Sequence, residues 1–266
     1  MRFAAIILTL TVMGSAAPLT HALAQNEDDV TPPEMLVECG EMEKPDAKCL
    51  SEAVRQAAAQ IKEKSWRDAA YRELAKSYAS DRYFDKALSL IDKIETPDTK
   101  AMTIRGIGMA AADLKLDKAA YDSLFTQLKA KKDTITHLPS HDIAETYIAM
   151  SQSFAGLYEE AFKTASAMKN DALQHKAFGE IGEVAAERGD TLQAFKALSQ
   201  ITSHSYRNKS ARTISGIFLK AGDIKSAIQA ANMVDNAYMR ASALQAILDH
   251  LQGHTVVTED GEDVAP

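Results

Sequence analysis

The sequence lacks a clustered basic stripe, and this absence argues against a nucleic-acid-binding surface. Its 30 lysines and arginines are outnumbered by 37 aspartates and glutamates, so the formal net charge is −7. Aromatic residues are also scarce, at 6%, although 46% of the residues are hydrophobic. Much of this hydrophobic fraction is alanine, which suits helices that pack closely together.

Motifs typical of enzymes are absent as well. The sequence has no G-x-S-x-G nucleophile turn, no glycine-rich phosphate loop and no H-E-x-x-H zinc motif. His137 and His141 have a metal-like spacing, but Pro139 lies between them and no framework of carboxylates and histidines surrounds them, which favours a solvated loop. We expect His175 and His204 at the surface. The sequence therefore predicts no catalytic residue, no metal site and no cofactor.

A short apolar run lies near the N-terminus. Arg2 precedes an apolar stretch over residues 3–13, and Ala22-Leu23-Ala24 has the A-x-A form of a cleavage site. The run is too short to span about 30 Å of hydrocarbon, so a cleaved signal peptide (1–24) is favoured over a membrane anchor. We predict a periplasmic or secreted protein that begins at Gln25, with net charge −7 − 1 = −8 and no integral membrane segment after processing.

Two cysteines, Cys39 and Cys49, remain in the exported part. In an oxidising compartment a lone close pair is most simply a disulfide, and the spacing fits neither a thioredoxin motif nor a metal site. We expect this disulfide to anchor the N-terminal segment 25–49. Because the closed loop is short, the chain-entropy model gives the bond about 2–3 kcal/mol of stabilisation.

A pattern of large and small residues repeats along most of the chain. A large apolar residue anchors each unit, at steps of 33, 41, 33, 33 and 33: Leu74, Ile107, Ile148, Ile181, Ile214 and Ile247. The next residue is small in the five full units, and an alanine follows thirteen residues after the anchor: Ala87, Ala120, Ala161, Ala194 and Ala227. A fixed period of this length is typical of stacked-repeat proteins.

Within each unit the apolar residues recur three and four positions apart, which predicts helices rather than strands. Eight residues after the anchor come Arg82, Lys115, Gly156, Gly189 and Gly222. The glycines are suited to end a helix, because glycine adopts the left-handed conformation at little steric cost. Each unit is therefore predicted to be a helical hairpin, in which the recurrent alanine lets two helices cross closely.

This pattern resembles the tetratricopeptide repeat (TPR). The family signature places Leu-Gly three and four residues after a large residue, followed by an aromatic, an alanine and a final proline. Tyr71, Leu74, Ala75, Tyr78 and Ala87 follow it, although the period is 33 rather than 34 and the final proline is absent. The resemblance implies an all-α, right-handed α-solenoid of helical hairpins over residues 50–252. It would comprise a capping helix at 50–64, five repeats at about 66–241 and a last helix at 242–252.

Other segments flank or interrupt these repeats. Eight extra residues fall within 129–142, where we expect a longer turn and a helix break at Pro139. The tail 253–266 and the stretch 26–33 are acidic, and both are predicted to be disordered. The disulfide would pin segment 34–49 across the open end of the stack, beside the capping helix.

In the resembled family, the first helix of each repeat lines a concave groove that binds a partner. The positions two before and two after each anchor would face it, which gives these candidates for a partner-binding groove: Arg72, Lys76, Arg105, Met109, Thr146, Met150, Glu183 and Arg212. Arg72, Lys76 and Arg105 should converge on one wall, where an unpaired basic cluster would favour an acidic segment of a partner. Glu73 and Asp68 are near in sequence and could neutralise them.

These expectations favour a non-catalytic scaffold in the periplasm or cell envelope, with a peptide or a partner domain bound in its groove. The asparagines with which family members clamp a C-terminal carboxylate are missing at the matching positions, so that binding mode is not implied. Two other functions stay open: an enzyme or small-ligand carrier with an unrecognised site, and a secreted factor that acts outside the cell. For the groove residues themselves, an ordinary solvated face is the alternative.

Overall fold

The computed structural model describes Cys39 and residues 46–253. Within these residues it contains twelve α-helices and no strand, which confirms the predicted all-α class. The helices are α1 (Ala47–Gln60), α2 (Lys64–Ser80), α3 (Phe84–Ile91), α4 (Pro97–Ala112), α5 (Lys118–Asp133), α6 (Leu138–Phe154), α7 (Tyr158–Ser166), α8 (Asp171–Glu187), α9 (Thr191–Gln200), α10 (His204–Lys220), α11 (Ile224–Asn232) and α12 (Ala237–Leu251).

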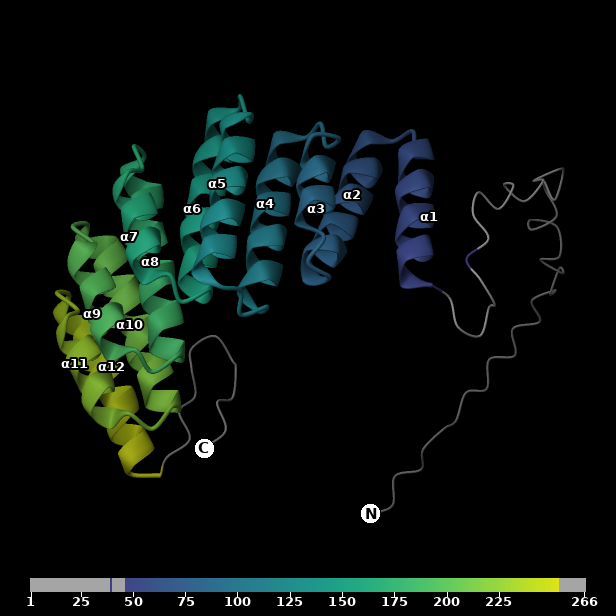
Figure 1. The fold of residues 1–266 in the computed structure, drawn as a ribbon. Helices are drawn as coiled ribbons and strands as arrows, with labels where there is room; N and C mark the ends of the chain where they lie inside the picture. The colour runs from purple at the N-terminus through teal and green to yellow at the C-terminus, as the bar shows by residue number, and fades with distance from the viewer. Residues whose placement is uncertain (1–38, 40–45, 254–266) are drawn as a thin grey trace, which may run out of the picture.

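The helices form a curved row of hairpins, which bends where α7 and α8 follow α6 (Figure 1). We call α2, α4, α6, α8, α10 and α12 the first helices, and each of them contacts the next one along the row. The second helices α3, α5, α7, α9 and α11 each contact the first helix that precedes them. Among the described helices, every extensive contact therefore joins elements that are at most two apart in chain order.

Each first helix begins ten residues before its anchor, at positions 64, 97, 138, 171, 204 and 237. Residues at or next to these positions explain why the first helices begin there. Asn170 and Asn236 cap α8 and α12, because their side chains accept hydrogen bonds from the backbone N–H groups of Leu173 and Met239. Pro97 and Pro139 lie in the first turns of α4 and α6, where a missing N–H costs nothing.

The turn within each hairpin relies on a left-handed residue. The five residues eight after the anchors all have positive φ: Arg82 (65°), Lys115 (49°), Gly156 (79°), Gly189 (72°) and Gly222 (77°). After Gly189, the side chain of Asp190 caps α9 by accepting a hydrogen bond from the Gln193 N–H at 3.2 Å. The glycine thus ends one helix and the aspartate starts the next, as the helix-stop prediction required.

Replacing Gly189 by alanine is expected to lower the free energy of unfolding by about 1 kcal/mol, because a Cβ is unfavourable at positive φ. Gly216 is the matched control, because an added Cβ there would also meet open space, but within helix α10. Gly216→Ala should instead raise stability by up to about 1 kcal/mol through helix propensity. Thermal unfolding followed by circular dichroism measures both, and shifts of the same sign would contradict this account.

The predicted anchors and small residues make up the core. All six anchors are buried, and so is the small residue after each of the first five. Of the recurrent alanines, Ala120 is half-buried and the other four are fully buried. First helices approach closely at the glycines, since a Cβ on Gly108 would lie 2.5 Å from the Ser151 Oγ and one on Gly182 would lie 2.9 Å from the Ile214 Cδ1.

A buried polar position, not anticipated from the sequence, ties consecutive hairpins together. Asp68, six residues before its anchor, accepts hydrogen bonds from the backbone N–H groups of Glu95 and Thr96 at 3.1 and 2.8 Å. The equivalent Asn208 accepts one from the Asp235 N–H at 2.8 Å. His175 occupies the same position and is buried, so its predicted surface place is wrong.

The eight extra residues lengthen a helix and not a turn, which corrects the expectation for 129–142. Helix α5 has 16 residues, whereas the other second helices have 8 to 10. Leu124, Leu128 and Lys132 continue one buried face at four-residue spacing, and the Lys132 Nζ lies 3.2 Å from the Glu145 Oε1 of α6. His137 directly precedes α6 and His141 lies in its first turn, so the two histidines do not form a solvated loop. No cluster of metal-ligating side chains occurs among the described residues.

Two helix boundaries also differ from the predicted ones. Helix α1 spans 47–60 and not 50–64, because the Asp46 side chain accepts a hydrogen bond from the Lys48 N–H at its start and the backbone becomes extended at Ile61. Helix α12 begins at 237 and not 242, because Asn236 supplies its cap. The predicted signal peptide (1–24), the acidic stretch 26–33 and all of the predicted tail 253–266 except Gly253 lie outside the described residues. None of the helices that the structure describes is long and apolar enough to cross a bilayer.

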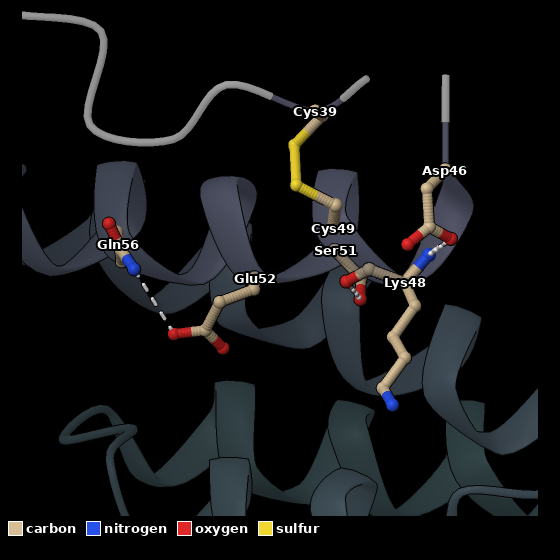
Figure 2. The surroundings of a disulfide bond; sticks show 7 residues. All are labelled: Cys39, Asp46, Lys48, Cys49, Ser51, Glu52 and Gln56. Atoms are coloured by element: carbon tan, nitrogen blue, oxygen red, sulfur yellow. Dashed lines mark hydrogen bonds between the residues drawn. A yellow bond between two sulfur atoms is a disulfide. The ribbon is translucent and has the colours of Figure 1, made fainter. Parts of the chain in front are cut away.

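Cys39 and Cys49 form a disulfide, as predicted (Figure 2). Their Cα atoms lie 5.3 Å apart, and Cys49 belongs to the first turn of α1. Titration of the denatured, unreduced protein is expected to find no free thiol, and two should appear after reduction. Two thiols before reduction would contradict the pairing. Replacing both cysteines by serine should cost about 2–3 kcal/mol of stability through the entropy of the unfolded chain.

Candidate functional site

An open pocket of about 360 Å³ lies on the surface between α2 and α4. It is lined by Arg72, Glu73, Lys76, Met102, Arg105, Gly106 and Met109. Two features of the sequence build it. Residues 72 and 76 are one helical turn apart on α2, and the 33-residue spacing places Arg105 on α4 at the position equivalent to Arg72. We call this site the α2–α4 pocket.

Gly106 shapes the pocket floor. A Cβ at this position would lie 2.6 Å from the Lys76 Cγ, so the aliphatic stem of Lys76 lies across α4 where Gly106 has no side chain. The charged end of Lys76 then reaches water, while its stem packs against the neighbouring helix. Met102 and Met109 add flexible apolar surface from α4.

Glu73 is shared between two of the three cations. Its Oε1 lies 2.8 Å from the Arg72 Nε, and its Oε2 lies 3.0 Å from the Lys76 Nζ. Hydrogen bonds from Lys76 and then from Arg72 hold the pKa of the Glu73 carboxyl below its usual value. The cluster is therefore not unpaired, which corrects that part of the expectation. Its formal charge remains positive, because three cations and one anion give 3 − 1 = +2.

Arg105 is placed differently from the other two cations. Its guanidinium carbon lies 5.6 Å from the centre of the Tyr147 ring on α6, a cation–π contact that steadies the side chain. Within the described part of the chain, no carboxylate forms an ion pair with it, and the residue is exposed. Its N–H donors are thus free to meet an anionic group that enters the pocket.

The structure brings together half of the predicted groove residues. Arg72, Lys76, Arg105 and Met109 share the α2–α4 pocket, whereas Glu183 and Arg212 lie further along the row on α8 and α10. Thr146 and Met150 are buried and do not line a groove. The reason is local, because α6 is packed between α4 and α8 and every residue from 148 to 153 is buried.

Sequence reasoning missed Met102 and Tyr147 and left the role of Glu73 open. A usable signal existed for Glu73, because a carboxylate three residues before a lysine on a helix pairs with it readily. Asp68, the other acidic residue considered, faces the start of α4 and does not take part. For Tyr147 there was no such signal, since its contact with Arg105 depends on how α4 and α6 pack.

A serine, a histidine and an aspartate meet at the start of α6, but not in the order of a catalytic triad. The Ser140 hydroxyl donates to Asp98, and the His137 Nδ1 lies 2.7 Å from the same Ser140 Oγ. In a nucleophilic relay the histidine lies between the serine and the acid, whereas here the serine lies in the middle and is fully buried. These hydrogen bonds are therefore best explained as structural contacts that join the start of α6 to α4.

No family model matches the chain, and no curated protein or solved structure is significantly similar to it.

Proposed function

We propose that this protein is an exported, non-catalytic scaffold that binds an acidic segment of a protein partner at the α2–α4 pocket. In this proposal the hairpins are TPR-like and wind into a right-handed α-solenoid with a 33-residue period. The observation that carries the proposal is the convergence of Arg72, Lys76 and Arg105 on one pocket of an otherwise acidic chain.

The distribution of charge favours an acidic ligand at this place. The chain carries a formal net charge of −7, so an acidic partner is repelled by most of its surface and attracted to a pocket of charge +2. Carboxylates that reach the cations form charge-assisted hydrogen bonds, which are stronger than neutral ones. Met102 and Met109 suit an apolar side chain next to the acidic one.

Glu73 sets the order in which the pocket is filled. A ligand carboxylate meets Arg105 first, because this cation has no acidic partner within the described residues. It must then displace Glu73 from Arg72 or Lys76 to gain a second contact. Glu73 therefore acts as an internal competitor that a ligand replaces.

The disulfide supports an extracytoplasmic location. Disulfides persist in oxidising compartments and are rare in the cytosol. We propose that residues 1–24 direct export and are cleaved after Ala24, in a region outside the described residues. Cell fractionation would distinguish the periplasm or cell envelope from secretion into the medium.

Charge reversal at the three cations tests this function. The variant Arg72→Glu, Lys76→Glu, Arg105→Glu is expected to lose the partner captured by reversible crosslinking from the envelope fraction. Binding of a synthetic peptide from the acidic segment of that partner, measured by fluorescence anisotropy at low salt, should weaken at least about 100-fold, because two or more charge-assisted contacts are lost. The helical circular dichroism signal and melting temperature should be retained.

A matched control separates the pocket from overall charge. Lys176→Glu, Lys220→Glu and Lys225→Glu change the net charge equally at exposed positions on α8, α10 and α11, and should leave peptide binding nearly intact. Glu73→Gln should tighten binding, since it removes the competitor. If the triple reversal still binds the peptide as well as the parent protein at low salt, the three cations are an ordinary solvated face.

A small-ligand carrier remains the second candidate, because about 360 Å³ falls within the range of small-molecule sites, roughly 300–1,000 Å³. Calorimetric titration with small dicarboxylates addresses it directly. Tight binding of such a molecule, with no binding of the acidic peptide, would favour the carrier over the scaffold.

A further inference from the structure

Helix α1 carries an uncovered apolar stripe. Leu50 and Val54 are 43% and 47% exposed, and Ala57 is exposed as well. These residues lie four and three apart, so they share one side of the helix. We call them the α1 stripe. Only Ala58 of this helix is buried, which is little for a 14-residue helix that tertiary contacts must stabilise.

Comparison with the other second helices shows what usually covers this side. The residue equivalent to Val54 is a fully buried alanine in α3, α7, α9 and α11, and the residue equivalent to Ala57 is buried in each of them. In those hairpins the first helix packs against the second. Helix α1 is thus a second helix whose stripe has no first helix against it within the described residues.

Trp66 on α2 is a second exposed apolar residue at the α1 end of the row. Its equivalent in the fifth hairpin, Tyr206, lies with its ring centre 5.7 Å from that of His175, on the preceding first helix. No first helix precedes α2 in the described part of the chain, and Trp66 is 72% exposed. Trp66 and the α1 stripe are therefore exposed for the same reason, which is that no first helix precedes α2 within the described residues.

The disulfide holds Cys39 at this end of the row, and Cys39 follows an apolar stretch in the sequence. Cys39 is bonded to Cys49 (Figure 2), and Leu50 of the stripe is the next residue in the sequence. Met35, Leu36 and Val37 lie within four residues of Cys39, a reach of about 13 Å in an extended chain. Val54 lies five residues beyond Cys49, only about 7.5 Å along the helix.

We propose that residues 34–38 lie on the α1 stripe, with Met35, Leu36 and Val37 against Leu50 and Val54, and that the disulfide holds them there. This segment would take the place of the first helix that α1 lacks. The inference is independent of the α2–α4 pocket and of its ligand.

A second copy of the chain fits the α1 stripe less well. No second helix follows α12 within the described residues, so α1 of another molecule is the alternative partner that would complete a hairpin with it. However, the position after its anchor is Leu248, whereas the other first helices have small residues there: Ala75, Gly108, Ala149, Gly182 and Ser215. A leucine at this crossing keeps a partner helix from approaching as closely as in the other hairpins.

The test is made on the oxidised, full exported protein with all other residues unchanged. In the parent protein, nuclear Overhauser contacts are expected between methyl groups of Leu36 or Val37 and those of Leu50 or Val54. The variant Met35→Ser, Leu36→Ser, Val37→Ser should exchange its α1 amide hydrogens at least about tenfold faster, because the helix loses its cover. Val256→Ser with Val257→Ser, in the other terminal segment, is the matched control and should leave exchange unchanged.

Each alternative occupant gives a different result. Absence of the methyl contacts, together with unchanged α1 exchange in the serine variant, would overturn the proposal. So would a concentration-dependent doubling of mass in the parent protein with contacts from α12 to α1, since a second copy would then cover the stripe. The serine changes lie outside the described helices, so a failure of the whole chain to fold is not expected to obscure the result.

Discussion

Replacing Glu183 by glutamine is expected to raise the melting temperature at pH 8 by several degrees and to leave it nearly unchanged at pH 4. Glu183 lies on α8, and burial of its carboxyl is the main cause that raises its pKa from 4.5 to about 7. The nearby carboxylates of Glu180 and Glu187 raise this pKa further, and Lys209 opposes them. The ionised form is thus the unfavourable one in the folded protein.

The direction of the pH dependence follows from proton linkage. Below pH 4.5 both the folded and the unfolded chain hold the proton, so Glu183 costs nothing. Between pH 4.5 and about 7 the unfolded chain releases it while the folded chain retains it, so stability falls as the pH rises. Above pH 7 the loss is complete, at about 1–3 kcal/mol, and glutamine avoids it.

Thermal unfolding at the two pH values measures this difference. Glu187→Gln is the matched control, because Glu187 is an exposed carboxylate on the same helix and should give a small gain at most. An equal gain from Glu183→Gln at pH 4 and pH 8 would mean that side-chain packing, and not ionisation, is responsible.

Replacing Ala194 by leucine is expected to lower the free energy of unfolding by about 1–3 kcal/mol, because the site has no room for a larger side chain. Ala194 is fully buried where α9 crosses α8, and a Cβ on Gly182 would lie only 3.4 Å from the Ala194 carbonyl oxygen. At roughly 2–4 °C per kcal/mol for a chain of this size, the melting temperature should fall measurably.

An exposed alanine provides the comparison. Ala119 lies near the start of α5 and is exposed, so Ala119→Leu should leave the melting temperature nearly unchanged. If Ala194→Leu melts at the same temperature as the parent protein, the recurrent alanine is not a packing position and the register of the repeats is wrong.

The sequence was most informative where one residue type has one physical role. Large anchors flanked by a small residue predicted the buried side of each first helix, and every first helix begins ten residues before its anchor. The glycines at 156, 189 and 222 predicted three of the five left-handed turns. Even Arg82 and Lys115, which are not glycines, adopt that conformation, because the hairpin geometry outweighs their own preference.

Prediction failed where the outcome depends on how neighbouring elements meet. Thr146 and Met150 have the register of groove residues, yet α4 and α8 bury them from both sides. Lys132 looks like a surface residue, but its stem extends the buried face of α5 and so keeps the extra residues helical. The period of the apolar residues predicts which side of each helix is buried, but it does not predict which other helix covers that side.

The restriction of helix contacts to near neighbours has a consequence for how the chain is made. Residues from Ala58 to Ile148 form one hydrophobic cluster, and those from Ala149 to Ile247 form another, so the division falls within α6. Apart from its residues on α6, the first cluster is buried without any helix from α8 onward. Chains are synthesised from the N-terminus, at about 5–20 residues per second. The leading half can therefore acquire its core while the trailing half is still being added.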